Sequence, residues 1–256
     1  MEILGQWPTW TWCAIAAAAA FAALVHGAVG FGFPLLSTPL VALLTDVRTA
    51  VLTTLLPNIV INLISVLRGA QWRQTLATYW PVAAWVFAGT LVGTAVLARA
   101  NPLVLKLLLA GLVLFYLLQS RRPGGTVMLR RHPRWGAMVL GTLGGFFSGT
   151  VNVAVPPLLI YFSALELAPL VMTQAMNLSF LAGRSTQVLA LVSTGHMGTG
   201  WFLLGLPLTV LSVLSLSGGF SLQRRFAPQT FTRLMRVLLW GMAFALTAQV
   251  LRDYFR

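Results

Sequence analysis

The chain has 256 residues, of which 58% are hydrophobic and 8% are charged, and it carries a net charge of +13. A soluble domain has about 25% charged residues, so the composition excludes a water-exposed globular surface and predicts an all-α polytopic membrane protein. The basic residues stand in short clusters between apolar segments, a pattern typical of membrane topology near anionic lipid, and we therefore exclude nucleic acid as a partner.

Apolar segments of two lengths alternate along the chain. Eight are long enough to span a bilayer, which takes about 20 residues. Two shorter segments, 34–45 and 155–165, would reach only about 18 Å into a hydrocarbon core of about 30 Å. Non-helical backbone at that depth is tolerated only where it faces protein or a watery cavity, so both short segments are predicted to be broken or re-entrant. The long segments are 10–29, 47–67, 75–98, 102–120, 135–151, 169–191, 199–220 and 229–251.

A break rich in glycine and proline precedes each short segment. The sequence from His26 to Pro34, HGAVGFGFP, returns in altered form from Ser148 to Pro156 as SGTVNVAVP. Glycine and proline together interrupt a helix. Interrupted helices at matching positions in two halves of a membrane protein are typical of a transport site.

The internal repeat extends beyond these breaks. Thr54 and Asn58 match Thr173 and Asn177 at an offset of 119 residues. Four further matches share an offset of 126 residues, namely Pro81 with Pro207, Gly93 with Gly219, Arg99 with Arg225 and Pro102 with Pro228. Four identities at one offset are not expected by chance, so we infer two pseudo-symmetric repeats.

A basic linker, 121–134, separates the first transmembrane repeat, 1–120, from the second, 135–256. Because the linker holds five arginines in fourteen residues, we predict that it is cytoplasmic, together with the loop after Arg68. If the short segments re-enter the membrane, the repeats are inverted, Arg224 is cytoplasmic and both termini lie outside. If each broken pair crosses only once, the repeats are parallel and Arg224 lies outside. We favour inversion.

The two breaks also predict a binding site. Pro34 and Pro156 suit the first turn of a helix, and a helix N-terminus offers free N–H donors and partial positive charge. Two such ends that enter from opposite sides would meet near mid-membrane and form a site for a small oxyanion; the alternative is that the breaks only permit tight packing. The predicted substrate-binding residues are Gly30, Phe31, Gly32, Pro34, Asn58, Asn152, Pro156, Asn177 and Arg184.

Polar side chains within the membrane are functional candidates. Asn58 and Asn177 stand at matching places, so we assign both to the transport pathway, with bonding between helices as the alternative. Arg184 lies deep in its segment, and the chain has only four acidic residues that could pair with it. We interpret Arg184 as a residue whose guanidinium binds two oxygens of an anion. The alternative is that Arg184 lies near the membrane surface and serves only topology. His26 is the candidate for proton coupling, against a packing role.

Enzyme and cofactor motifs are absent from the sequence. It contains no His-Glu-x-x-His, no Cys-x-x-Cys and no Walker loop, so we expect no metal site, no cofactor and no enzymatic activity. Ser148 follows a glycine-rich stretch, but the spacing does not fit Gly-x-Ser-x-Gly. An intramembrane enzyme that uses Ser148 is therefore the less favoured alternative.

These residues resemble the sulfite exporter TauE/SafE family, also called the 4-toluene sulfonate uptake permease family. The resemblance covers essentially the whole chain, and the run from Gly27 to Pro34 is its most specific part. The second copy departs from the first, because Asn152 and Ala154 stand where the first copy has glycine. The resemblance implies transport of small sulfur-containing anions, such as sulfite, sulfoacetate or other organosulfonates, by a multi-pass protein of the bacterial inner membrane.

We therefore predict a secondary transporter that binds such an anion at mid-membrane between the two broken helices. Its partners would be the small anion, the lipid bilayer and protons as the coupling ion. An anion channel or channel-like subunit is the alternative. The sequence leaves open the identity of the anion, the direction of transport and the oligomeric state.

Overall fold

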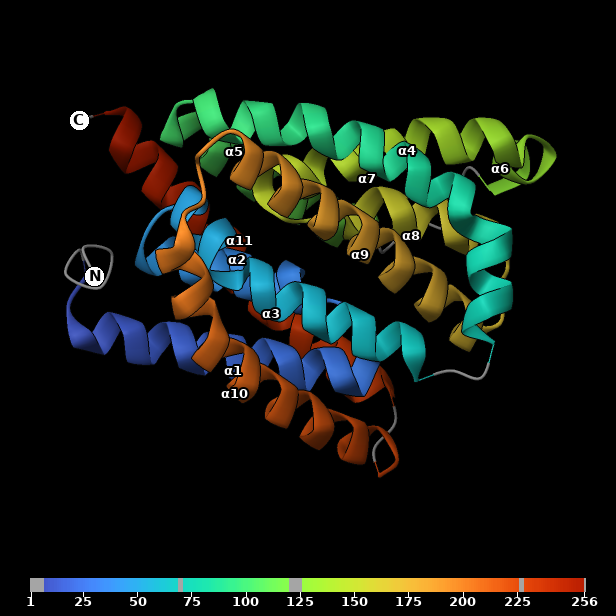
Figure 1. The fold of residues 1–256 in the computed structure, drawn as a ribbon, viewed down its shortest axis with the longest axis horizontal. Helices are drawn as coiled ribbons and strands as arrows, with labels where there is room; N and C mark the ends of the chain where they lie inside the picture. The colour runs from blue at the N-terminus through green and yellow to red at the C-terminus, as the bar shows by residue number, and fades with distance from the viewer. Residues whose placement is uncertain (1–6, 69–70, 120–125, 226–227, 256) are drawn as a thin grey trace.

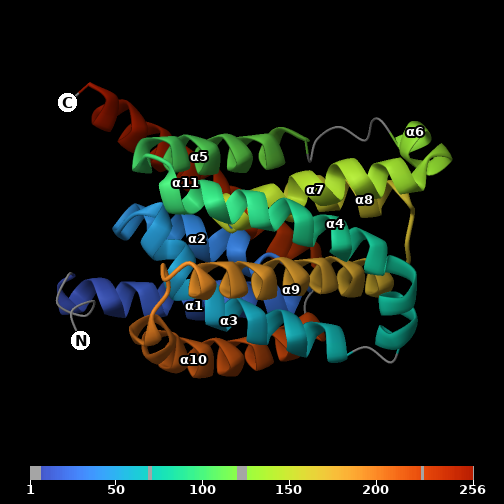
Figure 2. The ribbon, with the colours of Figure 1, turned by 45° about the horizontal axis from the view of Figure 1, so that its top comes forward.

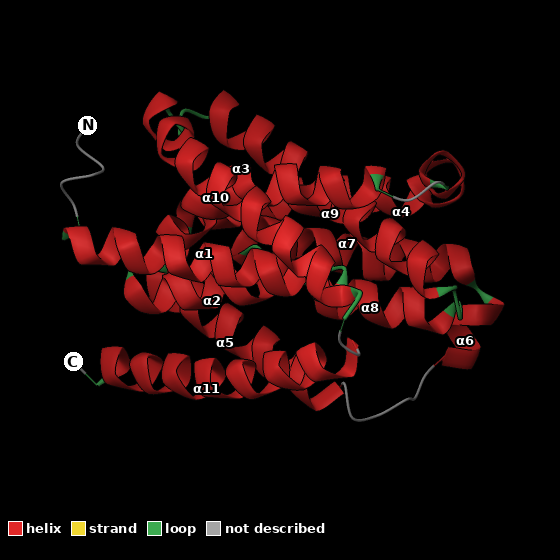
Figure 3. Ribbon diagram, turned by 90° about the horizontal axis from the view of Figure 1, so that it is seen from below, coloured by secondary structure: helices red, strands yellow, loops and turns green. Residues whose placement is uncertain are grey.

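The computed structural model describes residues 7–68, 71–119, 126–225 and 228–255, and all regular structure in these ranges is helical (Figures 1 and 3). The helices are α1 (Thr9–Val29), α2 (Phe33–Leu44), α3 (Val47–Leu67), α4 (Trp72–Arg99), α5 (Pro102–Gln119), α6 (Thr126–Arg131), α7 (Pro133–Val151), α8 (Val155–Ala164), α9 (Pro169–Ser193), α10 (Thr199–Gln223) and α11 (Pro228–Tyr254).

Every predicted apolar segment is a helix. The two short segments are α2 and α8, and the long segments correspond to α1, α3, α4, α5, α7, α9, α10 and α11. In the described part of the chain, six of the long helices have the length and hydropathy of a membrane span. The other two, α7 and α9, are long enough, but their glycines and polar side chains make them less apolar. The chain is therefore a multi-pass helical membrane protein.

The central linker contains a helix that the sequence analysis does not predict. The short helix α6 lies within it, and Arg130 of this helix pairs with Glu166 after α8 at 2.6 Å. Both side chains are exposed. The first part of the predicted linker, 121–125, lies outside the described residues.

Both breaks occur where the sequence places them. Helix α1 ends at Gly30, whose φ is 97°, and Gly32, with φ 109°, precedes α2 and its first-turn proline. Helix α7 ends at Asn152, whose φ is 65°, and α8 follows with Pro156 in its first turn. These left-handed backbone conformations suit glycine, and asparagine is among the few other residues that tolerate them.

The helices run between two ends of the molecule. The chain termini lie at one end, and α6 lies at the other (Figures 1 and 2). At the end with the termini, Arg48 at the start of α3 donates to the carbonyl of Leu97 in the last turn of α4 at 3.0 Å, and Lys106 of α5 pairs with Asp253 of α11 at 2.5 Å. We call this end the Asp46 face, after the residue that caps α3.

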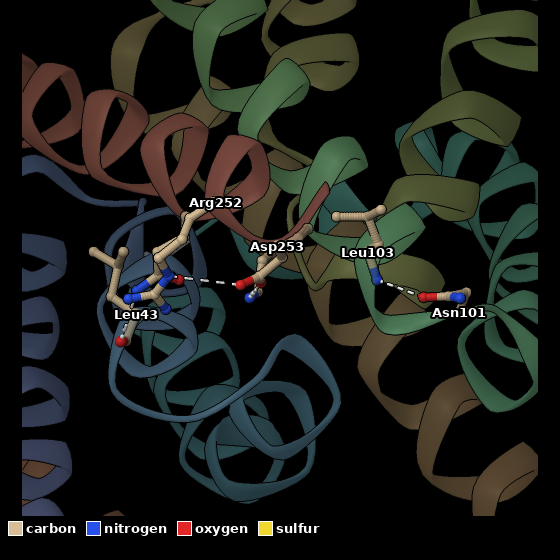
Figure 4. A network of polar contacts seen from close by, with 7 residues as sticks. Leu43, Asn101, Leu103, Arg252 and Asp253 are labelled. Atoms are coloured by element: carbon tan, nitrogen blue, oxygen red, sulfur yellow. Dashed lines mark hydrogen bonds and ion pairs between the residues drawn. The ribbon is translucent and has the colours of Figure 1, made fainter. Parts of the chain in front are cut away.

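Figure 4 shows a part of the Asp46 face, where the end of α11 lies beside α2. Arg252 and Asp253 of α11 are drawn close to Leu43 of α2, whose carbonyl accepts a hydrogen bond from the Gln249 amide at 3.2 Å. The end of α2 is therefore fixed to the last helix of the chain at this face.

The opposite end, which we call the Arg68 face, holds the end of α3 and the starts of α4 and α9. Gln174 of α9 links these three, because its Oε1 accepts from the Thr75 hydroxyl at 3.1 Å and its Nε2 donates to the Val66 carbonyl at 3.3 Å. The end of α10 lies here as well, since the Arg68 guanidinium stacks on the ring of Phe220 at 3.6 Å.

Glycines allow two helix pairs to cross in backbone contact, and each pair joins the first half of the chain to the second. In the crossing of α1 with α10, a Cβ on Gly27 would lie 2.4 Å from the Leu216 carbonyl oxygen. In the crossing of α7 with α4, a Cβ on Gly149 would lie 2.5 Å from the Thr90 carbonyl oxygen. The first and second halves of the chain therefore interlock, and the buried core includes residues of both halves and of both breaks.

The α1–α10 crossing gives a matched test in two neighbouring glycines. A Cβ on Gly219 would lie 2.2 Å from the Leu24 carbonyl oxygen, whereas a Cβ on Gly218 would meet nothing within 4 Å. Both changes to alanine gain up to about 1 kcal/mol of helix propensity, but Gly219→Ala must push two backbones apart, which costs about 1–3 kcal/mol or more. We expect Gly219→Ala to lower the apparent unfolding temperature of the purified protein and Gly218→Ala to leave it unchanged or raise it. Equal effects would contradict the crossing.

Candidate functional site

A cavity of about 510 Å³ extends from the Arg68 face to the first break. Its walls come from α1, the break, α3, the start of α9 and the end of α10. Two of the predicted substrate-binding residues, Gly30 and Phe31, line it. The polar groups around it come from Ser65, Arg68, Thr173, Gln174 and Gln223.

Arg68 is the cation of this cavity, and sequence reasoning used it only to assign topology. Its guanidinium rests on the Phe220 ring, and no acidic side chain among the described residues forms a salt bridge with it. Burial, and then the positive charge of Arg224, lower the pKa of Arg68. The available signal was its position three residues after Ser65, because residues at this spacing share one face of a helix.

His26 is completely buried and joins α1, α2 and α3 at the first break. Its Nδ1 accepts the backbone N–H of Phe33 at 3.3 Å, and its Nε2 lies 3.0 Å from the Ser65 hydroxyl. Because an N–H only donates, a neutral His26 carries its proton on Nε2 and donates it to Ser65. The ring thus satisfies one of the free donors at the start of α2, and its role in proton coupling stays a prediction.

The first break is held by α9, a helix of the second half of the chain. The Asn177 amide of α9 donates to the carbonyl of Gly30 at 2.8 Å and to the carbonyl of Thr173, one turn earlier, at 2.8 Å. A Cβ at Gly30 would lie only 2.7 Å from the Thr173 methyl group. The break and α9 are therefore in direct contact at the inner end of the cavity.

The second break is held by helices α2 and α3 of the first half of the chain through its own asparagine side chain. The Asn152 amide donates to the hydroxyls of Thr38 at 2.9 Å and Thr54 at 3.0 Å. In turn, Asn58 donates to the Asn152 Oδ1 at 3.3 Å, and Asn62 donates to the Asn58 Oδ1 at 2.7 Å. All five side chains are fully buried, so they form one chain of hydrogen bonds across the centre of the molecule.

Arg184 lies apart from the cavity at the Arg68 face. The side chain is 1% exposed, and its guanidinium donates to the Ser148 carbonyl at 3.0 Å, to the Ser148 hydroxyl and to Gln187 Oε1 at 2.5 Å. The Gln187 amide continues to the Gly149 carbonyl at 2.7 Å. Arg184 and Gln187 thus clamp the last turn of α7 before the second break.

The structure therefore divides the predicted binding residues into three places. Gly30, Phe31 and Asn177 gather at the inner end of the cavity, with Gly32 and Pro34 buried beside them at the start of α2. Asn58 and Asn152 belong to the buried network at the second break, and Pro156 is buried beside it in the first turn of α8. Arg184 contacts the end of α7. Whether these residues bind substrate stays a prediction.

Asn152 offers a test of the network that separates side chain from backbone. Asn152→Gly keeps the left-handed backbone but removes the amide bonds to Thr38, Thr54 and Asn58, which should cost about 1–3 kcal/mol. Asn152→Ala loses the same bonds and should cost about 1–2 kcal/mol more, because alanine disfavours a φ of 65°. We expect apparent unfolding temperatures in the order wild type, glycine variant, alanine variant. A glycine variant as stable as wild type would show that the bonds contribute nothing.

Comparison with known proteins identifies the chain at the level of the family. A search of curated proteins and a search of solved structures each gave no match. A family model described as "Sulfite exporter TauE/SafE" matches residues 15–246. This range includes both breaks, helices α3 and α9 with Asn58 and Asn177, and the cavity. The match covers most of the chain, agrees with the resemblance seen in the motifs and identifies a membrane transporter and not an enzyme. The chain belongs to the sulfite exporter TauE/SafE family.

Proposed function

We propose that this protein is a secondary transporter that carries a small sulfur-containing anion, such as sulfite, sulfoacetate or another organosulfonate, across the bacterial inner membrane. The observation that carries the proposal is the cavity of about 510 Å³ that joins Arg68 to the first break. A guanidinium without an acidic partner, next to hydroxyl and amide groups, suits an oxyanion, because it can fork two oxygens of one group.

We further propose that the protein has eight spans, with α7 and α9 among them, in two inverted repeats. The ends of the short helices support inversion: Leu43 of α2 contacts α11 at the Asp46 face, whereas Glu166, after α8, pairs with α6 at the Arg68 face. Helices α1 and α7 accordingly run in opposite directions in Figures 1 and 2. The positive charge of Arg224 is near enough to Arg68 to lower its pKa, and α6 of the arginine-rich linker lies at the same end. We therefore place the Arg68 face in the cytoplasm.

The contact beside the cavity favours a carrier over a channel. Asn177, which binds the Gly30 carbonyl, is fully buried and is not among the residues that line the cavity, whereas a channel needs a continuous open path. No nucleotide-binding motif occurs in the sequence, and we therefore propose that an ion gradient drives transport, with protons as the coupling ion and His26 as their carrier.

Arg68 provides the first test of the proposal, with Arg73 as its control. Both arginines lie at the same face, but only Arg68 lines the cavity, while the exposed Arg73 lies beside Trp72. We expect Arg68→Gln to raise the Kd for sulfite about tenfold, or about 1.4 kcal/mol, and Arg68→Lys to raise it less, because an ammonium cannot fork two oxygens. Arg73→Gln should bind as wild type does. The Kd is measured from the rise in apparent unfolding temperature with ligand concentration.

The ligand panel and a flux assay decide between the functional classes. Sulfite, sulfoacetate, taurine and acetate are compared as stabilising ligands, and saturable counterflow in proteoliposomes is expected for those that bind. Stabilisation by cations or neutral solutes alone would refute anion transport. Flux that does not saturate and follows voltage alone would identify a channel. Conversion of the anion to a product would support the alternative that the protein is an enzyme that uses Ser148.

A further inference from the structure

The residues that line the open cavity have counterparts in the other repeat, and these counterparts also lie together. At the cavity, a Cβ on Gly27 would lie 3.0 Å from the backbone nitrogen of Phe220. At the second break, a Cβ on Gly149 would lie 2.7 Å from the backbone nitrogen of Thr94, the counterpart of Phe220 at the offset of 126 residues. The α4–α7 crossing thus repeats the geometry of the α1–α10 crossing.

The correspondence extends to the polar side chains. At the offset of 119 residues, Ser65 corresponds to Arg184 and Arg68 corresponds to Gln187. Ser65 contacts His26, one residue before the first close-packed glycine, and Arg184 contacts Ser148, one residue before the second. Gln187 reaches the carbonyl of the second glycine itself. Ser148, Arg184 and Gln187 therefore form the pseudo-symmetric counterpart of the cavity wall. Here they bond to one another and to Gly149 and do not line an open cavity.

Arg184 is a cation in an environment that does not neutralise it. Its hydrogen bonds reach only neutral acceptors, Ser148 and Gln187, and its Nε has no partner among the described residues. The Thr94 hydroxyl, 3% exposed, is likewise without a partner. Burying a charge costs free energy unless it is paired. Arg184 contacts Ser148, and the Thr94 backbone lies against the neighbouring Gly149, so both unpaired donors belong to residues packed on the last turn of α7 and point to a ligand that supplies negative charge.

We propose that Arg184, Gln187 and Thr94 belong to a second oxyanion site, closed in this conformation, which opens toward the Asp46 face when the cavity at Arg68 closes. The site rests on the proposed transport function and deepens it, because it names the groups that the anion meets on the other half of its path. An oxyanion there takes the free Nε–H of Arg184 and displaces the neutral Ser148 and Gln187 from the guanidinium. Inverted repeats supply the two alternating access routes, and the anion shifts the population between them.

The two sites differ in where they hold their charge. Arg68 lies just past the end of α3, at the mouth of the open cavity. Arg184 lies seven residues beyond Asn177 along α9, or about 10 Å from the first break toward the Asp46 face. The anion therefore meets one guanidinium at the surface on one side and another deep in the membrane on the other.

The accessibility of matched cysteines tests the second site. In a Cys13→Ser background, Phe220→Cys and Thr94→Cys are reconstituted, and an impermeant anionic thiol reagent is added from either side. We expect Phe220→Cys to react from the Arg68 face without substrate. Thr94→Cys should react from the Asp46 face at least tenfold faster during sulfoacetate exchange than without sulfoacetate, which is used here because sulfite itself consumes thiol reagents. A Thr94→Cys protein that exchanges sulfoacetate but stays unreactive from that face, or reacts from the Arg68 face, overturns the proposal.

Substitution of Arg184 gives a second, independent measurement. Arg184→Gln should bind sulfite from the Arg68 face within about twofold of the wild-type Kd, whereas its exchange rate should fall at least tenfold. The proposal is overturned if Arg184→Gln exchanges sulfite at the wild-type rate, or if its Kd rises by the same factor as its exchange rate falls. If Arg184→Gln loses its unfolding transition, Arg184→Lys replaces it, and exchange at the wild-type rate in that folded variant is equally decisive.

The two failures are distinguishable. If the wild-type protein neither binds nor exchanges a sulfur-containing anion, the proposed function is refuted. If the wild-type protein exchanges sulfite while the labelling and the Arg184 variants give the contrary results, only the second site is refuted.

Discussion

Backbone that leaves a helix inside a bilayer has to find its hydrogen-bond partners within the protein, and the rest of this structure depends on how the two breaks meet that requirement. The Gly30 carbonyl is satisfied by Asn177, and Asn152 brings its own amide to Thr38 and Thr54. In both cases these partners belong to the other half of the chain, while backbone donors at the breaks also bond within their own half, as the Phe33 N–H does to His26. The two halves are therefore in direct contact at both breaks.

The departure between the two copies of the motif accounts for the asymmetry of the molecule. Gly30 turns the chain without a side chain, which allows Thr173 of α9 to approach it closely beside the cavity. Asn152 makes the corresponding turn with an amide that ties α7 to α2 and α3. Two related breaks thus differ, since the first borders a cavity and the second is bound into a buried network.

Hydropathy and the Gly/Pro pattern were sufficient to place the membrane helices and both breaks, because these depend on local sequence. Contacts between distant helices were not predictable in the same way. Thr173, Asn177 and Arg184 lie on one polar face of α9, yet the structure divides that face along its length among the cavity, the first break and α7. Periodicity shows which face of a helix is polar, but not which neighbour each turn meets. Arg68 was missed as a site residue for that reason, since only the approach of Phe220 turns a topological arginine into part of a cavity wall.

The few acidic residues explain how the buried Arg184 guanidinium remains available to an anion. Asp46 is used as the cap of α3, where it accepts the Thr49 N–H at 3.0 Å. Glu166 pairs with α6, and Asp253 pairs with Lys106 of α5. These three described acids lie at the two faces, so the interior carries positive charge without fixed negative charge. A carboxylate beside Arg184 would compete with a bound anion, whereas Ser148 and Gln187 are neutral and can be displaced without breaking an ion pair. A buried guanidinium with neutral partners therefore favours the passage of anions. Among the described residues, the lack of a buried carboxylate matters as much for this as the presence of the buried arginine.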